Sequence, residues 1–259
     1  MDRLAIREGE YRTDTAGVSL LSKMSPSLCF YRQMAVIVTR SSSRAKHARY
    51  GTAEWAGSSL EILRALESVG VEIGITGINH FMRLDSPCVF VGNHMSTLET
   101  FVLPAVIAPI RDVTFVVKQS LIDYPVFRHV MRSRDPVTVG RTNPRDDLKA
   151  VLEGGAERLR AGRSVIIFPQ TTRALAFDPK TFNTIGLKLA KKAGAPVIPI
   201  ALKTDAWGNG KHLKDFGRID PSKKVRFAFG EPLLIKDRGV EEHNRIIEFI
   251  SGKLREWDR

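Results

Sequence analysis

A histidine and an acidic residue follow a short apolar run at a spacing that suits general-base chemistry. The run Cys88-Val-Phe-Val-Gly92 has the character of a buried strand, and Asn93-His94-Met-Ser-Thr-Leu-Glu99 follows it directly. A helix that begins two or three residues after His94 places Glu99 in its first turn, within reach of the imidazole. Such a pair can remove a proton from a hydroxyl group. Taken alone, it also fits a turn histidine followed by a glutamate that only complements the helix dipole.

The elements that must position this pair are short apolar runs alternating with amphipathic stretches. The expected strands are 88–92, 113–117, 164–168, 197–202 and 225–229, and the expected helices are 146–161, 182–193 and a last one around 246–254. Gly194 is a plausible end for the second of these helices. The alternation predicts an α/β fold, with a mostly parallel or mixed sheet covered by helices on both faces. Such folds place their sites at the carboxyl ends of strands, where His94 falls.

Residues 1–50 are expected to form a helical membrane-association segment, separate from a second unit of residues 51–259. The apolar positions Leu20, Met24, Leu28, Tyr31, Ala35 and Val38 recur at helical spacing with basic residues nearby. Between Arg40 and Gly51, Ser41-Ser-Ser and several basic residues interrupt this pattern. The helix either lies in a membrane interface with its apolar side down or packs on its own domain.

Composition limits the possible functions. The chain has 259 residues, and its 40 Lys and Arg against 28 Asp and Glu give a net charge of +12. This excess favours contact with nucleic acid, anionic lipid or a phosphorylated substrate, although it can also serve solubility alone. No nucleic-acid-binding motif is found, so no nucleic-acid partner is expected. The two cysteines, Cys29 and Cys88, and six histidines lack ligand-like spacing, so neither a disulfide framework nor a metal is expected.

The apolar runs of the sequence are too short to cross a membrane, and this limits where the protein can be located. No run reaches the roughly 18 apolar residues of a membrane span, and the first 15 residues lead into no apolar core of a secretory signal. We therefore expect a peripheral, monotopic protein on the cytoplasmic face of a membrane.

Four blocks along the chain occur in an order and spacing typical of one enzyme family. They are Asn93 to Glu99, Val139-Gly-Arg141, Phe168-Pro-Gln-Thr-Thr-Arg173 and Val197-Ile-Pro199. The stretch from Lys118 to Pro125 is similar to a segment that family members carry between the first two blocks. In these features the chain resembles the glycerolipid acyltransferase family, of the lysophosphatidic acid (1-acyl-sn-glycerol-3-phosphate) acyltransferase type.

The resemblance implies a reaction and roles for the residues in the blocks. A fatty acyl group would move from acyl-CoA or acyl carrier protein to the hydroxyl of a lysophosphatidic-acid-type lysolipid, without a cofactor or an acyl-enzyme. His94 would act as the general base and Glu99 would orient it. Arg141 and Arg173, with Lys118 as a third cation, would hold the acceptor phosphate. The implied substrate-binding residues are Lys118, Arg141, Gln170, Thr171, Thr172 and Arg173.

The chain departs from the usual family residues at four places. Glu99 and Gly140 stand where the family has Asp, Gln170 stands for Glu, and Thr171 stands for Gly. Glu99 keeps the charge of Asp and adds one methylene group. Gln170 removes a negative charge near the expected acceptor site, and Thr171 replaces a conformationally permissive glycine. These changes leave open a lysolipid with another headgroup, such as an amino acid or choline, or a non-catalytic basic membrane-binding protein.

A second segment, Asn79-His80-Phe-Met-Arg-Leu-Asp85, matches the strict family pattern Asn-His-x-x-x-x-Asp better than the first one does. No buried strand is expected before His80, however, and Ser86-Pro87 follows Asp85 where a helix would have to continue. The sequence context therefore favours His94 over His80.

Overall fold

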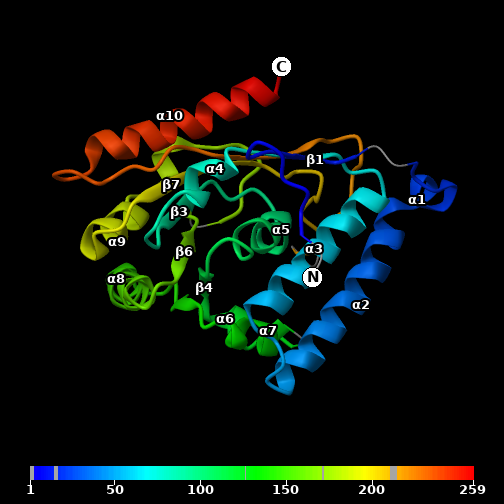
Figure 1. Ribbon diagram of the computed structural model, residues 1–259, viewed down its shortest axis with the longest axis horizontal. Coiled ribbons are helices and arrows are strands. Elements are labelled where there is room, and N and C mark those ends of the chain that lie inside the picture. Colours follow the sequence, from blue (N-terminus) through cyan, green and yellow to red (C-terminus); the bar gives the residue numbers. More distant parts are fainter. Residues whose placement is uncertain (1–2, 15–16, 126, 171, 211–214) are drawn as a thin grey trace.

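An eight-stranded sheet organises the part of the chain that the computed structural model describes, which is residues 3–14, 17–125, 127–170, 172–210 and 215–259. The strands are β1 (Tyr11–Arg12), β2 (Ile73–Thr76), β3 (Val89–Gly92), β4 (Val113–Lys118), β5 (Val137–Val139), β6 (Ser164–Ile167), β7 (Val197–Lys203) and β8 (Val225–Phe229). Their order is β1-β2-β8-β7-β3-β6-β4-β5. Figure 1 shows the part of this order from β7 through β3 and β6 to β4. Among the strand pairs of the described residues, β1–β2 and β7–β8 are antiparallel and the others are parallel, so the sheet is mixed, as predicted.

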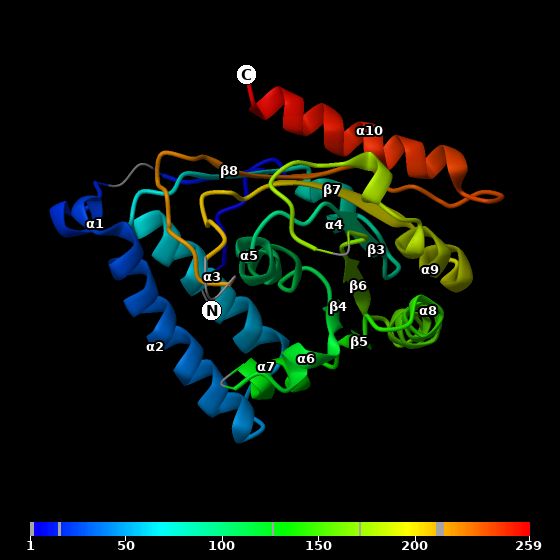
Figure 2. The same ribbon diagram turned by 180° about the vertical axis from the view of Figure 1, so that it is seen from behind.

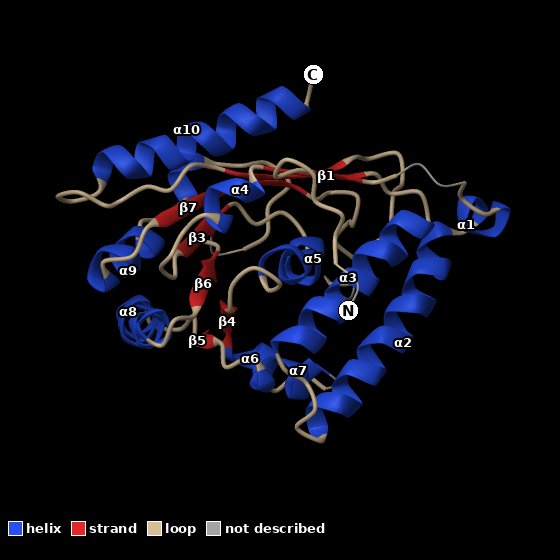
Figure 3. Cartoon of the chain, in the orientation of Figure 1, coloured by secondary structure: helices blue, strands red, loops and turns tan. Residues whose placement is uncertain are grey.

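Helices cover both faces of this sheet, which confirms the predicted α/β fold. They are α1 (Leu20–Met24), α2 (Pro26–Lys46), α3 (Thr52–Ser68), α4 (Ile78–Met82), α5 (Leu98–Ile107), α6 (Gln119–Ile122), α7 (Phe127–Ser133), α8 (Pro144–Arg160), α9 (Ile185–Ala193) and α10 (Val240–Trp257), with a short 3-10 turn at Pro179–Thr181. α3 and α5 pack over one face with α2 against α3, and α8, α9 and α10 pack over the other (Figure 3).

The central strands are buried on both sides, and their sequences show it. Every described residue of β3 and β6 is buried, as are the first six residues of β7, because helices lie above and below them. Continuous apolar runs are what such strands require. α9 ends as predicted at Gly194, which has a left-handed backbone with φ +64°.

Three strands were not predicted: β1, β2 and β5. β1 and β5 have two and three residues, too few to display a hydrophobic pattern, and the four residues of β2 include Gly74, which weakens a strand pattern. β2 bears on the second histidine segment. This strand is largely buried and ends at Thr76, and Gly77 then leads into α4, which contains His80. The expectation that no buried strand precedes His80 is therefore wrong.

The N-terminal helix is longer and more deeply packed than the sequence indicated. α2 continues through Ser41-Ser-Ser to Lys46, so the predicted interruption at these serines is wrong. Serine is a tolerable helix residue, and the Ser41 side chain is buried against the domain. Phe30, Met34 and Ile37 also belong to the main hydrophobic core. The division at residue 50 stays a prediction, and these contacts join the helix to the rest of the fold.

The predicted apolar stripe of this N-terminal region is divided between two environments. Leu20, Met24 and Leu28 are 70–79% exposed, whereas Tyr31 and Val38 are partly buried against the core. Within the described residues, none of the helices has the length and apolar character that a membrane crossing needs. In this N-terminal region the exposed apolar side chains lie on α1 and on the outer side of α2.

Candidate active site

The carboxyl ends of the parallel strands bring the predicted site residues to one edge of the sheet. β3 leads into His94, β4 ends at Lys118, β5 is followed by Arg141, and β6 is followed by the segment that ends at Arg173. A cavity of about 580 Å³ opens here. Its lining includes His94, Lys118, Arg141, Thr172 and Arg173. Thr171 lies outside the described residues.

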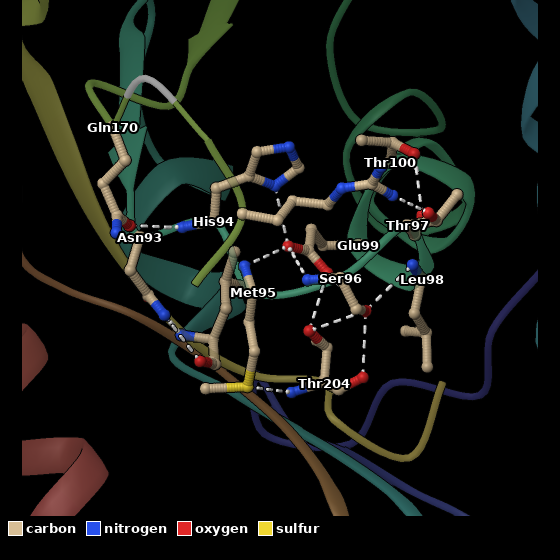
Figure 4. A network of polar contacts seen from close by, with 12 residues as sticks. Asn93, His94, Met95, Ser96, Thr97, Leu98, Glu99, Thr100, Gln170 and Thr204 are labelled. Carbon is tan, nitrogen blue, oxygen red and sulfur yellow. Dashed lines mark hydrogen bonds and ion pairs between the residues drawn. The ribbon is translucent and has the colours of Figure 1, made fainter. Parts of the chain in front are cut away.

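His94 and Glu99 form the expected pair. The Nδ1 atom of His94 lies 2.9 Å from Oε1 of Glu99, which sits in the first turn of α5 as predicted (Figure 4). Because an ionised carboxylate only accepts hydrogen bonds, Nδ1 must carry the proton. The other ring nitrogen, Nε2, is then a proton acceptor, and it is directed away from Glu99. The ring of Phe168 stacks on the imidazole with centroids 4.5 Å apart and so fixes its orientation.

Glu99 is completely buried and satisfied by donors on both oxygens. The backbone N–H groups of Met95 and Ser96 donate to Oε1 at 2.7 and 2.9 Å. The hydroxyls of Thr204 and Ser96 lie 2.6 and 3.0 Å from Oε2. Burial alone raises the pKa of Glu99, but the hydrogen bonds from His94, Thr204 and Ser96 outweigh it and hold this pKa below its usual value. The carboxylate therefore stays charged at neutral pH.

Several residues that build this arrangement were missed in the sequence. Thr204 follows β7 and is more than 100 residues from Glu99 along the chain. The Asn93 side chain joins the end of β3 to β7, because it accepts from the Leu202 N–H at 2.9 Å and donates to its carbonyl at 2.8 Å. The available signal was position: Asn93 and Thr204 both stand just beyond the carboxyl end of a buried strand.

Gln170 has a different place from the one expected. Its side chain is 4% exposed, and its Oε1 accepts from the backbone N–H of His94 at 2.7 Å (Figure 4). The residue lies behind His94 and is absent from the cavity lining. Both an amide oxygen and a carboxylate oxygen can accept a hydrogen bond from this N–H. From this position Gln170 holds the backbone of the His94 loop and does not contact a ligand in the cavity.

The cations at the cavity are held in distinct ways. The Arg173 guanidinium donates to Thr97 Oγ1 and, at 2.5 Å, to Asp215 Oδ1. Arg141 has a left-handed backbone with φ +59°, and its N–H donates to the Asp147 carboxylate. Together with Lys118, these residues are three of the cationic side chains that line the cavity containing His94. Such an environment suits an anionic ligand.

His80 lies elsewhere. Its Nδ1 is 3.0 Å from the carbonyl oxygen of Phe229, and the residue does not belong to the cavity lining. Asp85 is exposed, and no contact joins it to His80 in the described part of the chain. The arrangement at His80 thus differs from the buried pair of His94 and Glu99.

Similar proteins carry acyltransferase names. A family model described as Acyltransferase matches residues 72–203. A 1-acyl-sn-glycerol-3-phosphate acyltransferase from Pseudomonas aeruginosa is 31% identical over 153 residues, which cover 59% of this chain and 57% of that protein. A probable 1-acyl-sn-glycerol-3-phosphate acyltransferase from Mycoplasma genitalium is 29% identical over 150 residues, covering 56% and 55%. The chain thus spans little more than half the length of these relatives.

A solved structure has the same fold. The crystal structure of the 1-acyl-sn-glycerophosphate (LPA) acyltransferase PlsC from Thermotoga maritima matches with a TM-score of 0.65 at 20% identity. The match covers 91% of this chain and 96% of that one. At this identity the likeness concerns the fold alone.

We predict that Thr204→Val makes the protein less stable at neutral pH by about 1.5–3 kcal/mol, because a buried charged group loses a hydrogen-bond donor. The low pKa of Glu99 contributes stability above the pKa of the unfolded chain, and this contribution disappears as pH falls through the folded value. The difference from the unmodified protein should therefore shrink below pH ~4, near the ordinary carboxyl pKa. Urea denaturation across pH measures this. Thr204→Ser, which keeps the hydroxyl, is the control, and a pH-independent loss would mean that Thr204 only fills space.

Proposed function

Because the chain belongs to the acyltransferase family, we propose that it moves a fatty acyl group from a thioester to the hydroxyl of a lysophosphatidic-acid-type lysolipid. The donor would be acyl-CoA or acyl carrier protein, and no cofactor takes part. One observation carries the proposal: His94 is fixed by the buried Glu99 with its second nitrogen available, in a cavity that also contains Arg173. Acyl transfer to an alcohol needs this combination of base and anion-binding groups.

The reaction proceeds by direct transfer. Nε2 of His94 takes the proton of the acceptor hydroxyl while the oxygen forms a bond to the thioester carbonyl carbon. The buried negative charge of Glu99 stabilises the imidazolium that results. The carbon–sulfur bond then breaks, and the leaving thiolate receives the proton from His94. The chain itself forms no covalent bond to the acyl group.

The two substrates divide the cavity between them. The acceptor phosphate lies at Arg173, Arg141 and Lys118, because guanidinium groups bind phosphate oxygens in pairs. The acyl chain of the donor lies among the apolar side chains that line the cavity from α2, α3, α6 and α7. Figure 2 shows the course of these four helices. A volume of about 580 Å³ is within the range of ligand sites, roughly 300–1,000 Å³.

The exposed apolar residues of α1 and α2 serve as the membrane contact of this enzyme. Leu20, Leu21, Met24 and Leu28 are each at least 65% exposed, and Lys23 stands among them. Apolar side chains with neighbouring cations bind the interface of an anionic bilayer. A lysolipid acceptor is found in such a membrane, so this surface brings the enzyme to its substrate.

We predict that His94→Ala lowers kcat for acyl transfer by about 10²–10⁴, the usual contribution of a general base. His80→Ala is the matched control, and it should change stability by at most about 1 kcal/mol without comparable loss of activity. Product formation from a lysophosphatidic acid and a long-chain acyl-CoA is measured by mass spectrometry, with circular dichroism to verify the fold. Retained activity in His94→Ala would refute the mechanism.

We predict that Arg173→Ala raises KM for a phosphomonoester acceptor about 10–100-fold, because a charge-assisted hydrogen bond is lost. Asp215→Asn should instead lower this KM, because the acceptor phosphate no longer competes with the Asp215 carboxylate for Arg173. Steady-state kinetics with lysophosphatidic acid and with lysophosphatidylcholine separates the two effects. If both variants raise KM equally for lysophosphatidic acid and for lysophosphatidylcholine, the Arg173–Asp215 pair stabilises the fold instead of binding the phosphate.

We predict that the double variant Leu21→Glu, Leu28→Glu loses most of its binding to anionic phospholipid vesicles, because two exposed apolar contacts become repulsive charges. Leu234→Glu changes a residue that is also 67% exposed but lies away from α1 and α2, and it should bind as before. Co-sedimentation at low and high salt measures both. Equal binding of all variants would place the membrane contact elsewhere.

A further inference from the structure

The cavity that contains His94 has polar groups at the end far from the cations of the acceptor site. This end is lined by Ser41, Tyr50, Ser58, Ser59, Thr114 and Arg134. Ser41, Tyr50, Ser59, Thr114 and Arg134 are each at most 6% exposed. Between the two ends the lining is mainly aliphatic and aromatic. A saturated hydrocarbon chain would thus pass through an apolar passage and finish against hydroxyls and a guanidinium.

A continuous row of rings leads from the histidine to this polar end. His94 stacks on Phe168 at 4.5 Å, Phe168 lies 6.2 Å from Phe115, and Phe115 lies 5.9 Å from Trp55. The Arg134 guanidinium lies over Trp55 at 4.9 Å from the ring centre. The imidazole and the guanidinium therefore stand at opposite ends of one wall.

The length of this passage follows from β4. Lys118 is at the carboxyl end of the strand, whereas Thr114, four residues earlier, donates to the carbonyl oxygen of Arg134 at 2.8 Å. Four strand residues span about 13 Å. An extended alkyl chain advances roughly 1.25 Å per carbon with C–C bonds of about 1.5 Å. An acyl chain that runs beside β4 from its carboxyl end therefore reaches the level of Thr114 and Arg134 at about its tenth to twelfth carbon.

Arg134 has hydrogen-bonding capacity left at this position. Its Nη2 donates to Thr52 at 3.0 Å and to Asp112 at 3.3 Å, but its buried Nε donates to no acceptor within the described residues. The nearby hydroxyls of Tyr50 and Ser58 lie 2.6 Å apart. A buried donor without a partner is unfavourable, and a methyl end cannot provide one. An oxygen atom on the ligand can.

We propose that this polar end is a binding site for an oxygen substituent, a hydroxyl group, on the distal part of the donor's acyl chain. The proposal rests on the acyltransferase function proposed above. A neutral hydroxyl fits better than a carboxylate, because it can both donate to and accept from the hydroxyls of Tyr50 and Ser58, whereas a carboxylate only accepts. The site is therefore selective for hydroxyacyl thioesters over unsubstituted ones of equal length.

The test compares 12-hydroxydodecanoyl-CoA with dodecanoyl-CoA as donors for the 259-residue chain. We expect kcat/KM to be at least about tenfold higher for the hydroxylated donor, as for a hydrogen bond to a charged group. In Arg134→Met this preference should disappear. Tyr50→Phe, which leaves the Arg134–Asp112 ion pair in place, should reduce the preference and guards against misfolding of the first variant. Arg163→Met is the matched control, because Arg163 also binds Asp112 but does not line the cavity.

The outcomes for this site and for the enzyme function are separable. Transfer of both donors at equal kcat/KM, or a preference that survives in both Arg134→Met and Tyr50→Phe, overturns the hydroxyl site and leaves acyl transfer intact. If no donor is transferred, calorimetric binding of 12-hydroxydodecanoate against dodecanoate still decides the question. Tighter binding of the hydroxy acid that depends on Arg134 supports the site, and equal binding overturns it.

Discussion

A charged carboxylate with no access to solvent is the constraint on which the site depends. A buried Glu99 keeps its charge only if donors replace the water that it loses, and four groups besides His94 do so. Two come from the turn between β3 and α5, one is the Ser96 hydroxyl, and one is Thr204 after β7. Because the single charge of Glu99 binds all of these donors, it holds the turn, the end of β7 and the His94 imidazole in place together.

The sequence was sufficient for the parts of the fold that have strong local patterns. The buried runs of β3, β4, β6, β7 and β8 were predicted because continuous apolar residues are typical of strands covered on both faces. The pairing of His94 with Glu99 was predicted because it is local: a strand, a short turn and the first turn of a helix determine it. Local geometry of this kind can be reasoned from spacing.

Contacts between distant segments could not be predicted in this way. Thr204 is one of many threonines, and only the parallel register of β3 and β7 brings it to Glu99. Gln170 was interpreted as a lost charge near the acceptor, although its oxygen faces the His94 backbone. On α2, helical spacing showed that apolar residues share a face, but it did not show that Tyr31 meets Trp207 while Leu28 remains exposed. Each of these contacts depends on a partner residue from a distant segment, and the local sequence pattern around one residue does not identify that partner.

An arginine–aspartate ion pair stands at each end of the cavity, and the two pairs differ in how readily a ligand can replace the aspartate. At the acceptor end, Asp215 is 41% exposed and binds Arg173, so an incoming phosphate can take its place.

At the distal end, Asp112 accepts hydrogen bonds from Arg134, from Arg163 at 2.7 Å, from the Thr52 hydroxyl and from the Val113 N–H. A ligand anion would have to break all of these bonds together, and that makes exchange unfavourable. The acceptor end can therefore exchange its internal anion for a charged headgroup. The distal end retains its own anion, and what remains there for a ligand is the hydrogen-bonding capacity of neutral hydroxyls and of unused guanidinium donors.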